Sequence, residues 1–125
     1  MLFRSYDKKR ALNFYTYAAS EGYIPAQYLL GPIYVNGEST ERNLFLGHAW
    51  LEIAAGNRYE PAVSALRQLE NDMTLSEIEA SKREFMNLQQ NVLGKLDSPF
   101  VVEERIKAEQ AQEQQEESHV RRRRR

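Results

Sequence analysis

The sequence predicts an all-α fold made of stacked antiparallel helix pairs. Residues 11–30 match residues 47–66 at an offset of 36, with six identities among 20 aligned positions. The identities fall on residues that would pack, and the apolar residues of each expected helix are spaced i, i+3, i+4 and i+7, as on one face of a helix. No stretch alternates convincingly between apolar and polar residues, so we expect no sheet. Because a single helix pair cannot bury its apolar stripe, the pairs must stack on one another.

The first expected pair occupies residues 11–36. Gly22 ends its first helix, because glycine adopts the left-handed turn at little cost. Pro25 suits the first turn of the second helix, and Asn36-Gly37 ends it. The expected inward faces are Ala11, Phe14, Tyr15, Ala18 and Ala19 in the first helix, and Ala26, Leu29, Leu30, Ile33 and Tyr34 in the second.

The second expected pair repeats this plan, with a break at Gly56-Asn57 and Pro61 at the start of its second helix. Small alanine side chains leave room where helices cross, and large aromatic side chains fill the space beside them. Trp50 is expected to contribute most to the core. The expected inward residues are Trp50, Leu51, Ala54 and Ala55, followed by Ala62, Ala65, Leu66 and Leu69.

Two further helices are expected after the pairs. Thr74-x-x-Glu77 is a capping box, and it opens a helix that Gly94 can end. Ser98-Pro99 opens a charged, Glu/Gln-rich helix over residues 98–118, which has strong helix formers but little to bury. Residues 119–125 are expected to be a disordered basic tail. In the capping helix we expect Leu75, Ile78, Phe85, Leu88 and Val92 to point inward.

The repeated units resemble a known family. The first carries Arg10-Ala11-x-x-Phe14-Tyr15-x-x-Ala18-Ala19-x-x-Gly22, then Ala26-Gln27-x-x-Leu30-Gly31-x-x-Tyr34. This pattern resembles the Sel-one-like repeat, a branch of the tetratricopeptide-like superfamily. The second copy is similar, but has Arg58 where the family usually has glycine. The resemblance implies a short right-handed α-solenoid over residues 7–93, and a non-enzymatic adaptor or scaffold in bacterial signalling or regulation, with no cofactor.

The superfamily also implies a groove for a protein or peptide partner. Its groove positions fall at equivalent places in the two units and offer an apolar end and an amide- and hydroxyl-rich end. That chemistry suits an extended or amphipathic peptide with one hydrophobic anchor. Proline inside the second helix should kink it without ending it. The expected binding residues are Tyr28, Pro32 and Val35, with Ser64, Gln68 and Asn71 from the second unit.

Catalytic and metal sites are not expected. The chain has no cysteine, which excludes disulfides, thiol nucleophiles and cysteine-based zinc sites. His48 and His119 show no second histidine or carboxylate at a deliberate metal-ligand spacing, so structural or solvent roles are favoured. No glycine-rich phosphate loop is present. We therefore expect no catalytic residue, no metal and no cofactor.

The arginine run Arg121, Arg122, Arg123, Arg124 and Arg125 supports an alternative function. Such a run can bind nucleic acid, an acidic protein or an anionic lipid surface. A nucleic-acid- or anionic-surface-associated protein is therefore the second hypothesis, although nucleic acid is the less favoured partner. A solvated tail without a specific role is the alternative to both.

The N-terminal residues do not form an export signal, because apolar residues precede Lys8-Lys9-Arg10 rather than follow them. We expect a cytoplasmic protein without a membrane span, or a periplasmic or secreted one if an upstream signal is missing. The first helix lacks a capping neighbour. Either Leu2, Phe3 and Tyr6 fold back over it, or upstream sequence or another chain covers it, including a second copy in a homo-oligomer.

Overall fold

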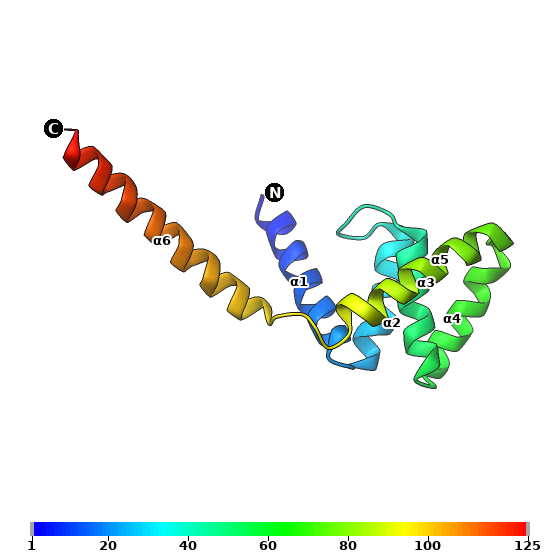
Figure 1. The fold of residues 1–125 in the computed structure, drawn as a ribbon. Coiled ribbons are helices and arrows are strands. Elements are labelled where there is room, and N and C mark those ends of the chain that lie inside the picture. Colours follow the sequence, from blue (N-terminus) through cyan, green and yellow to red (C-terminus); the bar gives the residue numbers. More distant parts are fainter. Residues whose placement is uncertain (1, 125) are drawn as a thin grey trace.

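The chain folds into a helical body from which one long helix points away (Figure 1). The computed structural model describes the backbone of residues 2–124 and the side chains of residues 6–124. All regular structure in that range is helical, so the all-α prediction is confirmed. The elements are α1 (Leu2–Ser20), α2 (Ile24–Asn36), α3 (Leu44–Gly56), α4 (Glu60–Asn71), α5 (Leu75–Asn87), the π-turn η1 (Leu88–Val92) and α6 (Pro99–Arg123).

The turns between α1 and α2 and between α3 and α4 have the same geometry, 36 residues apart. Gly22 and Arg58 both adopt left-handed conformations, with φ of 95° and 63°. Each N–H bonds the carbonyl three residues earlier, at 3.1 and 3.0 Å. The next N–H, of Tyr23 or Tyr59, reaches back five residues, at 3.0 and 3.3 Å. Both turns are therefore Schellman motifs, and Pro25 and Pro61 lie in the first turns of the helices that follow.

Replacing Arg58 with glycine should raise the free energy of unfolding by up to about 1 kcal/mol. A left-handed conformation costs a non-glycine residue roughly 1–2 kcal/mol, which exceeds the roughly 0.5–1 kcal/mol of extra chain entropy that glycine brings. Gly22→Ala, at the equivalent position, should lower stability by a similar amount. Urea unfolding of both variants measures the two effects, and a destabilised Arg58→Gly protein would contradict this account.

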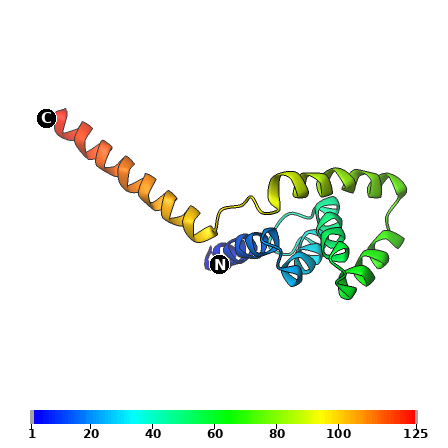
Figure 2. The ribbon, with the colours of Figure 1, turned by 60° about the horizontal axis from the view of Figure 1, so that its bottom comes forward.

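Helix α3 lies at the centre of the body and packs against α2, α4 and α5. Trp50 is 1% exposed, which confirms its predicted inward position. Figure 2 shows α5 running along one side of the body, where it covers α3. The core residues are Ala19, Ala26, Leu30, Ala49, Trp50, Ile53 and Leu88, with Ile33, Tyr34, Phe85 and Val92 packed against them.

Helices α2 and α3 approach closely because each has a glycine at the contact. A Cβ atom added to Gly47 would lie 2.8 Å from the Gly31 carbonyl oxygen and 2.6 Å from Cγ2 of Val35. One added to Gly31 would lie 2.6 Å from Leu51. Helix α2 continues through Pro32 without interruption, as expected. The kink at Pro32 stays a prediction.

A buried glutamine joins the two helix-turn-helix units. The Gln27 amide nitrogen donates to the Ala19 carbonyl at 3.0 Å, in the first turn. Its amide oxygen accepts from Asn57 at 3.2 Å, in the second turn. Because Gln27 is 2% exposed, these bonds satisfy a side chain that would otherwise be costly to bury.

Four residues expected to point inward are exposed instead, and Ala11 is one of them. Tyr15, Leu29 and Leu75 have 42%, 43% and 82% of their surface exposed. Helical spacing gives the direction of the stripe but not its width, so the expectations for these residues were wrong.

The outer face of α1 is contacted by the start of α6. Phe14 packs edge-on against Phe100, with ring centroids 4.9 Å apart. Arg10 donates to Glu103 at 2.8 Å, which lowers the pKa of the Glu103 carboxyl. Phe14 therefore packs against α6, although its spacing predicted a position within the core.

Of the alternatives expected for the outer face of α1, the fold-back of Leu2, Phe3 and Tyr6 was wrong, while coverage by upstream sequence or by another chain stays a prediction. Residues 2–20 form one continuous helix because nothing in that stretch breaks it, and Tyr6 is 62% exposed. The side chains of Leu2 and Phe3 lie outside the described residues. Part of the face that the fold-back was expected to cover is occupied by Phe100 and Glu103 of α6 instead.

Helix α6 extends five residues beyond the predicted end at residue 118. The Ser98 hydroxyl caps its start by accepting from the Phe100 amide. Arginines 121–123 lie in its last turn, where positive charge stabilises the helix dipole. The basic segment is therefore helical through Arg123, and the expectation of disorder there was wrong. None of the described helices has both the length and the apolar content needed to cross a membrane.

Candidate functional site

The three predicted binding residues of α2 are half-buried. The Tyr28 ring meets the Tyr59 ring edge-on, with centroids 5.5 Å apart. The Val35 side chain lies against α3 at Gly47, and its carbonyl accepts from Arg42 at 3.0 Å. Val35 is therefore partly used in helix packing, which leaves Tyr28 and Pro32 as the main apolar contributions from this helix.

The three predicted binding residues of α4 are Ser64, Gln68 and Asn71, and all are exposed. Their spacing of i, i+4 and i+7 places them on one face of the helix. The Tyr28–Tyr59 contact connects α2 to the residue that precedes α4. The α4 face offers hydroxyl and amide groups to solvent, as the sequence indicated.

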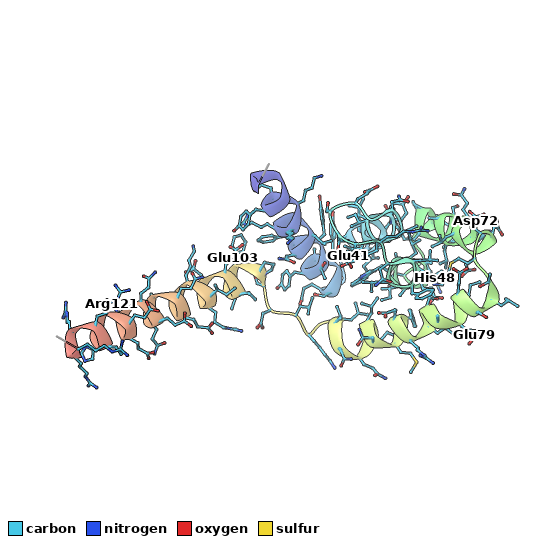
Figure 3. The ribbon with its side chains drawn as sticks, turned by 90° about the horizontal axis from the view of Figure 1, so that it is seen from above. Glu41, His48, Asp72, Glu79, Glu103 and Arg121 are labelled. Atoms are coloured by element: carbon cyan, nitrogen blue, oxygen red, sulfur yellow. The ribbon has the colours of Figure 1, made fainter. Side chains whose placement is uncertain are left out.

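The arginine run at the end of α6 lies far from α2 and α4. Arg121 marks the distal part of α6, beyond Glu103, which lies near α1 (Figure 3). Every described side chain from Glu104 to Arg124 is exposed. Four consecutive arginines on a helix point in different directions around its axis, so they form a diffuse positive end rather than one basic face. Arg125 lies outside the described residues.

A group of ionisable side chains surrounds His48, which lies inside the body (Figure 3). His48 belongs to α3 and is fully buried. Its Nε2 atom lies 2.8 Å from Glu70 Oε1 of α4, and its Nδ1 atom lies 2.8 Å from Ser81 Oγ of α5. One imidazole ring therefore joins three helices. We name His48, Glu52, Glu70 and Ser81 the His48 cluster.

Glu52 adds a second carboxylate to the His48 cluster. Its Oε1 atom lies 3.7 Å from His48 Nδ1. Burial raises the pKa of Glu52 and the negative charge of Glu70 adds to that rise, while His48 and Lys82 oppose it. One ligand atom each from His48, Glu52 and Glu70 lie within 4.8 Å of one another, so these residues could hold a metal ion.

The order hydroxyl, imidazole, carboxylate in the His48 cluster is also that of a hydrolytic triad. However, Ser81 is fully buried, and its Oγ atom bonds the Ile78 carbonyl at 2.7 Å. A nucleophile must reach its substrate, and this hydroxyl is closed off from solvent. The arrangement can hold a proton or a cation, but it does not present a nucleophile.

Sequence reasoning missed the His48 cluster. The i, i+4 spacing of His48 and Glu52 was a visible signal, so the statement that no carboxylate has metal-ligand spacing was wrong. Glu70 and Ser81 follow His48 by 22 and 33 residues. Only the packing of α4 and α5 on α3 brings them together. The expected structural role of His48 agrees with its burial and its hydrogen bonds.

Comparison of the chain with protein-family models, curated proteins and solved structures found no match.

Proposed function

We propose that this chain is a non-enzymatic protein–protein interaction module, an adaptor or scaffold of the Sel-one-like type. Its helix pairs would stack as a short right-handed solenoid. The observation that supports this most is the equivalence of the turns at Gly22 and Arg58, which both have a positive φ and the same pattern of backbone hydrogen bonds, 36 residues apart. Stacked repeats of this kind present extended surfaces that bind other proteins.

The proposed binding surface runs over α2 and α4. Tyr28 and Pro32 supply its apolar end, and the exposed Ser64, Gln68 and Asn71 supply its polar end. An extended peptide or an amphipathic helix with one hydrophobic anchor fits this surface, because its polar groups would find amide and hydroxyl partners. A role in bacterial signalling or regulation follows from the family resemblance alone.

Selection of peptides from a displayed random library against the full chain tests this function. The triple variant Ser64→Ala, Gln68→Ala, Asn71→Ala should weaken selected peptides by at least about tenfold, or roughly 1.4 kcal/mol. Its stability should stay within about 0.5 kcal/mol of wild type, because all three side chains are exposed. A matched triple on α5 and η1, Ser76→Ala, Gln89→Ala, Asn91→Ala, should leave peptide affinity unchanged.

Salt dependence separates this proposal from the basic-tail alternative. Binding to the α2–α4 surface should change little between about 50 and about 200 mM salt, whereas phosphate contacts lose affinity steeply over that range. A variant lacking residues 119–125 should still bind the selected peptides. Failure to select any peptide would contradict the proposal. Ligands that need the arginines and weaken steeply with salt would favour the alternative.

A further inference from the structure

The hydrogen bonds of the His48 cluster determine which ring nitrogen carries a hydrogen. A serine hydroxyl has one hydrogen to donate. The Ser81 Oγ atom lies 2.7 Å from the Ile78 carbonyl oxygen, which can only accept. Ser81 must therefore donate to Ile78 and accept from His48 Nδ1, at 2.8 Å. It follows that Nδ1 carries a hydrogen.

The other ring nitrogen then needs a positive partner. His48 Nε2 faces Glu70 Oε1 at 2.8 Å. Two lone pairs repel at that distance, so either a proton or a metal ion must lie between them. Zinc bonds to histidine nitrogen and carboxylate oxygen at about 2.0–2.2 Å, which separates tetrahedral ligand atoms by about 3.4 Å. A small outward shift of the Glu70 side chain, which is 35% exposed, would make that room.

The charge of the cluster suits a divalent ion. Glu52 and Glu70 bring two negative charges next to one imidazole. A shared proton leaves one negative charge in excess in a partly buried site. Lys82 pairs with Glu79 at 3.1 Å in an exposed ion pair, and its positive charge also acts on Glu52. A divalent ion with a neutral imidazole makes the cluster neutral, which reduces the cost of burying its charges.

We propose that His48 Nε2, Glu70 and Glu52 bind one zinc ion, with water as the fourth ligand. Glu52 Oε1, which lies 3.7 Å from His48 Nδ1, would turn toward the ion at Nε2. The imidazole and carboxylate donors are those that zinc takes in proteins. Ser81 orients the ring through Nδ1, as a second-sphere hydrogen bond does at known histidine–metal sites. The ion would enter beside the partly exposed carboxylates and hold α3 to α4. The site shares α4 with the proposed binding surface, but Glu70 lies on a different face of that helix from Ser64, Gln68 and Asn71.

Zinc titration of the full, metal-stripped chain tests the site. Calorimetry should show one zinc per chain, with a dissociation constant of about 1 µM or tighter. Cobalt(II) should give the visible absorption of a tetrahedral complex. Glu70→Gln and Glu52→Gln should each weaken zinc binding at least about tenfold, and Ser81→Ala about tenfold to hundredfold. His119→Gln is the matched control, because it removes the chain's other histidine, on exposed α6; it should leave affinity unchanged.

Three results would overturn the proposal. One is the absence of zinc binding at about 100 µM, a hundred times the expected constant. Another is unchanged affinity in Glu52→Gln and Glu70→Gln, which would indicate adventitious binding elsewhere. The third is loss of binding in His119→Gln, which would place the ion on α6. If circular dichroism shows that Glu70→Gln fails to fold, the Glu52→Gln variant decides. The Glu52 carboxylate lies 3.7 Å from His48 Nδ1, which is too far for a hydrogen bond, so its loss should not unfold the chain.

Discussion

Replacing Trp50 with alanine should lower the free energy of unfolding by about 3–5 kcal/mol. Trp50 is the only tryptophan of the chain, and it is 1% exposed on α3, the helix that packs against α2, α4 and α5. Its removal leaves a cavity that neighbouring small residues such as Ala19 and Ala26 cannot fill. Such a loss is a large part of the roughly 5–15 kcal/mol that stabilises an ordinary domain.

Urea unfolding followed by far-ultraviolet circular dichroism measures the Trp50→Ala effect without relying on tryptophan fluorescence. Tyr15→Ala is the control, because the same apolar spacing placed Tyr15 inside but its side chain is 42% exposed. Its stability should stay within about 0.5 kcal/mol of wild type. A Trp50→Ala protein as stable as wild type would show that the inward orientation of α3 is wrong.

The turns and caps were predictable because their signals are local. Gly22, Pro25 and the capping box at Thr74 each act within a few residues of their own position. The structure has the left-handed turn at Gly22, and Thr74 and Glu77 bond each other's backbone amides as expected. Arg58 shows that the turn geometry holds even without the glycine that usually marks it.

Contacts between distant segments were not predictable in the same way. Phe14 and Trp50 occupy equivalent places in the two matching segments, yet Phe14 packs on Phe100 and Trp50 lies in the core. The difference arises because α3 has helices on several sides. Helix α1 packs mainly against α2, and it also contacts the first residues of α6. A helical spacing pattern describes one face of one helix and contains no information about its neighbours.

The two candidate sites differ in the same way, because one follows from a local pattern and the other from contacts between distant segments. The exposure of Ser64, Gln68 and Asn71 follows from their helical spacing away from the buried Ala62. The His48 cluster instead depends on three helices meeting. His48 is a polar residue in the most buried helix, and its cost of burial is offset by Glu70 and Ser81, which no local pattern relates to it.

Replacing Gly47 with alanine should lower the free energy of unfolding by about 2–3 kcal/mol, at the upper end of the usual cost of overpacking. The added methyl group would lie 2.8 Å from the Gly31 carbonyl oxygen and 3.0 Å from the Val35 amide nitrogen. Both are backbone atoms of α2, so no side-chain rotation relieves the contact and the two helices must separate. Gly31→Ala should cost less, because its closest neighbours are the side-chain atoms of Leu51.

Gly56→Ala makes the same substitution in the same helix with the opposite expected sign. Nothing lies within 4 Å of the methyl group it would add, and alanine is favoured over glycine in a helix by up to about 1 kcal/mol. Urea unfolding of Gly47→Ala, Gly31→Ala and Gly56→Ala therefore separates helix propensity from helix contact. If Gly47→Ala were as stable as Gly56→Ala, α2 and α3 could not lie as close as the structure places them. The position of Leu51 against Gly31, and with it the α2–α3 interface, would then be wrong.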